Sequence, residues 1–190
     1  MHEVSLNQVI QDYLTGEDIE LTTYEDIRQA LARILVEEKG YPPSNIKSKF
    51  PLDLNLKDKH YTIVLDFVVY YQGDPVFILA FCPGAIATYV TQYICAARIF
   101  PDKPVPYVLV TDSKDATLME TSTKKELCRG YTCIPHWHEL VKMAENTQPF
   151  EISAERIQKD RRVAHAMFAL SDGCCTTHCE SPRNNESRSN

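Results

Sequence analysis

The spacing of apolar residues along the chain predicts one α/β domain. After Thr23, which can cap a helix, apolar side chains recur at helical intervals over residues 27–35, and Gly40 marks the end of that helix. Residues 5–14 are expected to form a shorter helix before it. Two helices are therefore predicted within the first 40 residues.

Three strands are predicted next. Residues 46–56 have a mixed pattern, and Pro51 is typical of an edge strand or a bulge. Residues 61–71 are rich in β-branched and aromatic side chains, and residues 72–75 have the composition of a hairpin turn. Residues 76–82 are wholly apolar, which favours a central strand.

A helix over residues 85–100 connects the strand at 76–82 to an apolar strand at 105–111. This is the pattern of a βαβ unit, so these two strands are expected to be parallel. A short helix or turn is predicted at 115–118, with strand-like pieces before residue 135. Two further helices are predicted at 136–144 and 153–170. The predicted architecture is an α/β core of order α-β-β-β-α-β, with a mixed sheet and additional C-terminal helices.

Charge divides the chain unevenly. The 20 Lys and Arg against 26 Asp and Glu give a net charge of −6. Residues 1–40 hold nine acids and three bases, which account for all of it. A polyanion would therefore have to meet a local basic patch. Residues 1–150 are predicted to form the core domain, 151–171 a C-terminal helix, and 172–190 a disordered tail that contains cysteines.

The predicted order of elements resembles the nuclease fold of restriction enzymes. Short strings sharpen the resemblance to the N-terminal domain of type I restriction enzyme R subunits, and most closely to small stand-alone bacterial relatives. The likeness runs from about Leu14 to Pro135. The strings are Leu14-Thr15-Gly16-Glu17, Tyr24-Glu25-Asp26-Ile27-Arg28-Gln29, Glu38-Lys39-Gly40-Tyr41, Val64-Leu65-Asp66-Phe67-Val68-Val69-Tyr70 and Val110-Thr111-Asp112.

This resemblance implies a PD-(D/E)XK phosphodiesterase fold. Its site needs a helix acid, an Asp on the second strand, and Glu-X-Lys on the third. Two carboxylates hold a divalent cation, and the lysine orients the attacking water or adds positive charge.

Carried over residue by residue, Glu25 matches the helix acid and Asp66 the strand Asp. The third strand departs, because Ala80 and Cys82 stand where Glu and Lys are expected. Gln92 falls where the family often places a helix glutamine. No acid or Lys lies between Asp74 and Arg98 to replace the missing groups. We therefore expect no intact catalytic set, with Glu25 and Asp66 left as a weak metal pair at most.

Other interpretations of these residues stay open. Asp66 can be half of a structural ion pair with Arg28 or Arg98, since buried acids need partners. Glu25 can be an ordinary first-turn helix acid, and Gln92 an ordinary polar side chain. Asp112, at the end of the next strand, is the one plausible substitute for the missing acid.

Candidate chemistry also lies near the C-terminus. A basic concentration there could touch phosphate, or be only a solvated helix face; it consists of Arg156, Lys159, Arg161 and Arg162. Cys174, Cys175, His178 and Cys179 could bind zinc with a partner pair, for which Cys128/Cys133 or His136/His138 are the candidates. The two histidines are expected on different sides of a helix. Without a secretion signal, reduced cysteines are expected.

Three functions follow from these observations. The first is a cytoplasmic, bacterial nuclease-fold protein with a degraded site, which acts by binding DNA or a DNA-handling protein and needs no cofactor. The second is a Mg²⁺-dependent DNA endonuclease. The third is a protein-interaction module without nucleic acid. No membrane association is expected, and oligomers are possible.

Overall fold

A six-stranded mixed sheet forms the centre of the molecule. The structure is a computed structural model that describes residues 3–56, 59–101 and 103–176. The strands lie in the order β3-β4-β5-β6-β7-β8, and only β5 and β6 run parallel among neighbours. Their bounds are β3 Ile46–Leu56, β4 Lys59–Tyr71, β5 Asp74–Phe81, β6 Tyr107–Thr111, β7 Ala116–Glu120 and β8 Glu126–Arg129.

The central strands follow the sequence pattern closely. β5 is buried along nearly its whole length and lies third in the sheet, as its unbroken apolar run predicts. A two-residue turn joins it to β4, and both turn residues, Gln72 and Gly73, have positive φ values of 52° and 88°. These values suit the tight turn that matches the twist of paired strands. β3 is an edge strand, which accounts for Pro51.

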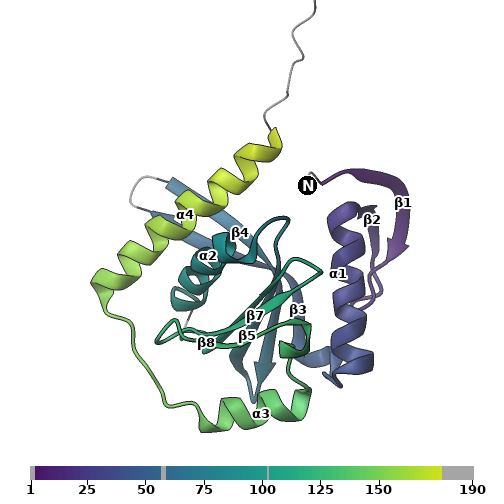
Figure 1. Cartoon of the computed structure of the whole chain (residues 1–190). Coiled ribbons are helices and arrows are strands. Elements are labelled where there is room, and N and C mark those ends of the chain that lie inside the picture. The colour runs from purple at the N-terminus through teal and green to yellow at the C-terminus, as the bar shows by residue number, and fades with distance from the viewer. Residues whose placement is uncertain (1–2, 57–58, 102, 177–190) are drawn as a thin grey trace, which may run out of the picture.

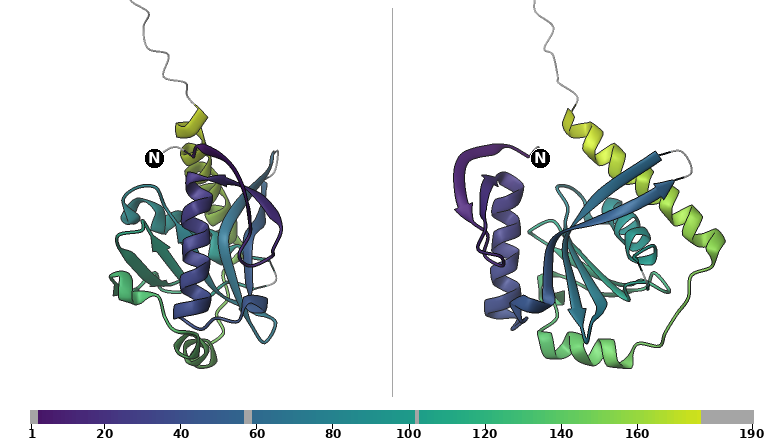
Figure 2. Two further views of the ribbon diagram at one scale, coloured as in Figure 1. Left: turned by 90° about the vertical axis from the view of Figure 1, so that its right-hand side faces the viewer. Right: turned by 180° about the vertical axis from the view of Figure 1, so that it is seen from behind.

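Helix α2 (Ile86–Arg98) carries the chain from β5 to the parallel strand β6, as predicted. It packs with α4 (Ala154–Thr176) on one face of the sheet (Figures 1 and 2). The other face is covered by α1 (Thr23–Arg33), the π-helical turn η1 (Ile34–Glu38) and α3 (Trp137–Asn146). Each face has its own buried apolar cluster. Two short 3₁₀ turns complete the list, η2 (Pro43–Asn45) and η3 (Tyr131–Cys133).

The N-terminal segment is not the predicted helix. Strands β1 (Ser5–Gln11) and β2 (Asp18–Thr22) form an antiparallel hairpin beside α1 (Figure 1). The apolar spacing over residues 5–14 is helical, so pairing with β2 overrides the local pattern here. Asp12 shapes the turn, because its carboxylate accepts the backbone N–H groups of Leu14 and Thr15 at 2.9 and 2.8 Å.

The short helix or turn predicted at residues 115–118 is wrong as well. That stretch begins β7, which pairs with β6 over its whole length and is largely buried. The strand-like pieces expected before residue 135 include β8. Pairing with a distant strand again outweighs the local sequence signal.

The C-terminal helix is longer than predicted. α4 runs to Thr176, so the first residues of the predicted tail are helical, and residues 177–190 lie outside the described part. In the described residues, no helix is both long and apolar enough to cross a membrane.

Candidate functional site

Glu25 lies buried in the first turn of α1. Thr22, rather than the predicted Thr23, caps this helix, and its hydroxyl accepts the Glu25 backbone N–H at 3.0 Å. The Glu25 side chain is only 3% exposed. A carboxylate buried to this degree requires compensating partners.

Asp66 marks the point at which the side chains of β4 change the face of the sheet on which they pack. Leu65 packs in the apolar cluster beneath α2, whereas Phe67, on the same side of an ideal strand, packs in the cluster beneath α1. The register leaves Asp66 opposite Lys49 of β3, where the pairing is interrupted. The regular alternation of side chains along β4 is therefore broken at this acid. On the other side, the Phe81 backbone N–H of β5 donates to Asp66 Oδ2 at 2.9 Å.

The guanidinium of Arg28 joins the two acids. Its Nη1 lies 2.5 Å from Glu25 Oε2, and its Nη2 and Nε lie 3.0 and 3.1 Å from Asp66 Oδ1. Of the two partners that the sequence offered for Asp66, Arg28 is therefore the one used. Arg98 donates instead to the carbonyl oxygens of Thr121 and Ser122.

Lys49 adds a second cation that the sequence analysis missed. Its Nζ lies 2.6 Å from Glu25 Oε2, and its side chain is 41% exposed. The backbone of Lys49 has a φ of +49°, a conformation uncommon for a residue with a side chain. No sequence signal marks this position, because neither the positive φ nor the proximity of β3 to α1 can be read from residue types.

Gln29 extends the network to the hairpin. Its Nε2 donates to Glu25 Oε1 at 2.9 Å and to Asp12 Oδ2 at 2.8 Å. Asp12 is buried, and burial, which raises its pKa, is outweighed by hydrogen bonds from Thr15, Gln29 and Leu14 that lower it. The network thus links the N-terminal hairpin, α1, β3 and β4.

The pKa values of the two candidate acids, Glu25 and Asp66, shift in opposite directions. Burial raises the pKa of Glu25, but the hydrogen bonds from Lys49 and Gln29 and the charge of Arg28 bring it below its ordinary value. For Asp66, burial outweighs the opposing effects of Arg28 and the Phe81 N–H, so its pKa is raised. Arg28 has a raised pKa, because its two acidic partners outweigh its own burial.

The third strand, β5, offers this network the Phe81 backbone N–H but no charged side chain. The pairing of β4 with β5 ends at Phe67–Leu79, and the next residue of β5, Ala80, packs in the apolar cluster beneath α2. Cys82 is buried, and burial raises the pKa of its thiol to about 11. Neither side chain can replace a carboxylate or an ammonium group.

Gln92 is buried on α2, as a site-facing residue would be. It hydrogen-bonds the hydroxyl of Tyr93, which in turn donates to the Phe81 carbonyl at 3.3 Å. Gln92 is therefore linked through Tyr93 to β5, the strand next to the one that carries Asp66.

Asp112 does not supply the missing acid. Its Oδ1 accepts the backbone N–H groups of Lys114 and Asp115 at 2.9 and 2.8 Å, which caps the turn after β6. Within the described ranges, no three His, Cys, Asp or Glu side chains are arranged to hold a metal ion.

The basic residues of α4 do not form one uniform patch. Arg156 is tied to Asp160, with Nε–Oδ2 at 3.0 Å and Nη2–Oδ1 at 2.9 Å, and Asp160 is fully buried against α2. Lys159 and Arg162 are exposed, and Arg161 is half-buried. Only part of the predicted cluster therefore faces solvent.

The two pairs predicted as partners for a zinc site, Cys128/Cys133 and His136/His138, differ from the sequence expectations. Cys128 and Cys133 form a disulfide, with their Cα atoms 5.6 Å apart. The prediction of reduced cysteines is therefore wrong for this pair. Cys82 and Cys95 are free and buried. His136 and His138 stack at 5.8 Å between ring centroids, not on different sides as expected. His178 and Cys179 lie outside the described residues.

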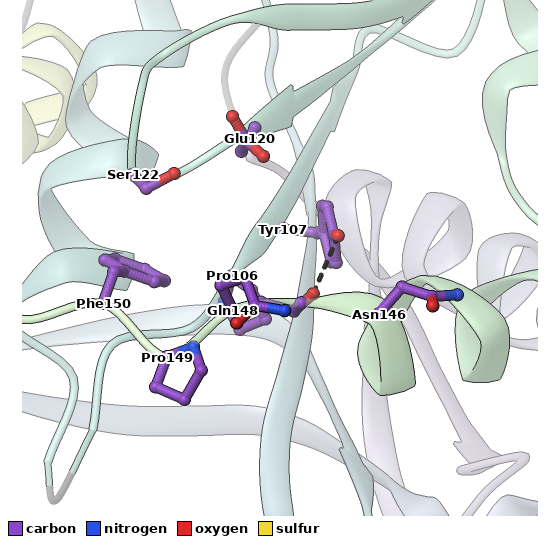
Figure 3. A pocket seen from close by; sticks show the side chains of 9 residues that line it. Pro106, Tyr107, Glu120, Ser122, Asn146, Gln148, Pro149 and Phe150 are labelled. Atoms are coloured by element: carbon purple, nitrogen blue, oxygen red, sulfur yellow. Dashed lines mark hydrogen bonds between the residues drawn. The ribbon is translucent and has the colours of Figure 1, made fainter.

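A separate pocket of about 290 Å³ lies near the start of β6, at the end of this strand that is away from Asp66 (Figure 3). Tyr107, at the start of β6, lines it, whereas Phe81 beside Asp66 pairs with Thr111 at the end of that strand. Its lining includes one carboxylate, Glu120, and two hydrophobic loop residues, Pro149 and Phe150. The pocket shares no residue with the acidic network.

Comparison with known families identifies the chain. The model of the family described as type I restriction enzyme R protein N terminus matches residues 23–135. The chain belongs to this family. The match begins at α1 and ends before α3, so it contains the two acids of this R-protein family member and leaves out the β1–β2 hairpin. No curated protein and no solved structure matched the chain.

Proposed function

We propose that this chain is a restriction-endonuclease-like domain that binds DNA in the cytoplasm and does not cleave it. The observation that carries the proposal is the position of Arg28, whose guanidinium contacts both candidate acids. Its charge supplies what a bound cation would supply to Glu25 and Asp66. The acids then serve to hold α1 on the sheet instead of activating water.

The missing side chains support the same proposal. Mg²⁺ favours a near-octahedral set of oxygen ligands, whereas both Asp66 oxygens already accept hydrogen bonds, Oδ1 from Arg28 and Oδ2 from the Phe81 backbone. Loss of one electrostatic catalytic group costs roughly 10²–10³-fold in rate. Here a carboxylate and a lysine are both absent from the third strand, so hydrolysis is expected to be negligible.

DNA is the favoured ligand for two reasons. The family is named for a restriction enzyme subunit, and restriction enzymes act on DNA. In addition, Lys159 and Arg162 lie one helical turn apart on the exposed side of α4, where they can contact phosphates. Since the whole chain is acidic, this local pair is expected to provide much of the attraction.

A cleavage assay tests the first half of the proposal. Purified protein is incubated with labelled duplex DNA and Mg²⁺ or Mn²⁺, beside an Asp66→Asn variant. We expect no product above background from either protein. Cleavage by the wild type that disappears in Asp66→Asn would establish the alternative, a metal-dependent endonuclease.

Fluorescence anisotropy at several salt concentrations tests the second half. The double variant Lys159→Ala/Arg162→Ala should bind DNA more weakly, with a salt slope reduced by about two, since each phosphate contact contributes about one. Lys142→Ala removes an exposed lysine from α3 and should bind like the wild type. Wild-type protein that fails to bind DNA at low salt would favour a protein-interaction module. Equal binding by the double variant and the wild type would exclude α4 as the contact.

A further inference from the structure

The hairpin leaves one strand edge without a neighbour in the described part of the chain. β1 pairs with β2 alone, in a two-stranded sheet separate from the six-stranded one. β2 is the strand that contacts α1, and β1 lies on its outer side (Figures 1 and 2). The backbone donors and acceptors on the outer edge of β1 are therefore available for another strand.

This edge is uncharged and exposes three apolar side chains. Val4, Leu6 and Val9 are 54%, 41% and 71% exposed, which makes three of the seven large exposed apolar residues of the described chain. From Ser5 to Gln11 there is no ionisable side chain. An exposed strand edge with these properties is a site of strand addition unless something blocks it.

The hairpin is also held in place at both ends of β1. Two hydrogen bonds join Val4 to Thr23: the Thr23 N–H donates to Val4 O at 3.0 Å, and the Val4 N–H donates to the Thr23 hydroxyl oxygen at 3.2 Å. At the other end, Asp12 accepts from the Gln29 amide of α1. The edge is therefore fixed before any partner arrives, which lowers the ordering cost of association.

We propose that β1 pairs antiparallel with β1 of a second copy of this chain. The two hairpins then form a four-stranded sheet across a two-fold axis near Val9. Charge selects this arrangement, because a chain of net charge −6 can meet its copy there without placing like charges opposite one another. Self-pairing through β2 would bring Asp18 and Glu20 close to their own copies.

The backbone sets the extent of the pairing. Asn7 has a φ of +52°, and the β1–β2 register shifts between Ser5 and Gln8. The regular part of the edge is therefore residues 8–11. A ladder of this length is short, so we expect a dimer that dissociates on dilution.

Sedimentation velocity over a concentration series tests the proposal. The wild type should shift from monomer to dimer as concentration rises, whereas Val9→Lys should stay monomeric because two lysines would meet at the axis. Val64→Lys is the matched control: Val64 is also an exposed valine, at 55%, but its strand lies between β3 and β5. It should dimerise like the wild type.

Hydrogen exchange of the wild type gives a second measurement that needs no variant. Amides within residues 8–11 should become more protected at high concentration. A wild type that remains monomeric at every concentration overturns the proposal. So does a dimer that Val9→Lys leaves intact or that shows no added protection in β1.

Discussion

Arg28 connects two carboxylates that are far apart in the sequence. Glu25 lies one turn before it on α1, and Asp66 comes from β4. A guanidinium keeps its charge at every physiological pH and presents five N–H donors in a fixed plane. It can therefore satisfy both acids permanently, whereas a bound Mg²⁺ would need further oxygen ligands and could exchange.

Removal of Arg28 should be costly. Arg28→Ala leaves Asp66 and Glu25 with much less compensation at a buried place, and loss of one partner of a buried ion pair costs about 3–5 kcal/mol. Urea unfolding measures the change. Arg33→Ala, which removes an exposed arginine from the same helix, should cost about 1 kcal/mol or less. Equal stability of the two variants would show that the Arg28 bridge contributes little.

The lowered pKa of Glu25 predicts a pH dependence with a definite sign. A lowered pKa stabilises the fold above the ordinary value of 4.5, and this contribution is lost as pH falls through the folded-state pKa. Glu25→Gln should therefore be less stable than the wild type near pH 7, and the gap should narrow in acid. Asp66, whose pKa shifts in the opposite direction, is present in both proteins. Unfolding free energies at a series of pH values check this, and a gap that is constant with pH would contradict it.

At the scale of elements, the sequence correctly predicts the helices and strands whose structure follows from their own local pattern. β4, β5, α2 and β6 each have a continuous apolar or periodic signal, and all four are found close to the expected bounds. β1 and β7 were mistaken for helix or turn, because pairing with β2 and β6 determines their structure. The same limit applies to the site. The pairing of Asp66 with Arg28 was one of two alternatives, and Lys49 was missed.

The packing of α4 on α2 includes a buried polar contact as well as apolar ones. Asp160 is fully buried and bonds Arg156, while Arg98 Nη1 lies 3.9 Å from its carboxylate and Cys95 Sγ 3.3 Å. Asp160→Ala should destabilise the protein by about 3–5 kcal/mol, since it leaves Arg98 buried without this acid. Glu155→Ala, an exposed acid on the same helix, should change stability by less than about 1 kcal/mol. Thermal and urea unfolding compare them, and similar losses in both variants would contradict the assignment.

At the scale of the whole molecule, the acidic network lies at the junction between α1 with its hairpin and the central sheet. Asp66 accepts the Phe81 N–H of β5 and contacts Arg28 of α1. Helix α1 lies on the side of the sheet away from α2 and α4 (Figures 1 and 2). Removing the cation bridge would loosen this junction. The placement therefore favours a structural role for the acids, which were predicted from the family resemblance as a metal pair.

Titration with Mn²⁺ followed by electron paramagnetic resonance tests this account most directly, with the wild type and Asp66→Asn measured side by side. Because Arg28 already compensates both carboxylates, the two proteins should leave the same concentration of free Mn²⁺ at every point of the titration. A saturable site with one Mn²⁺ per chain in the wild type, absent from Asp66→Asn, would contradict it.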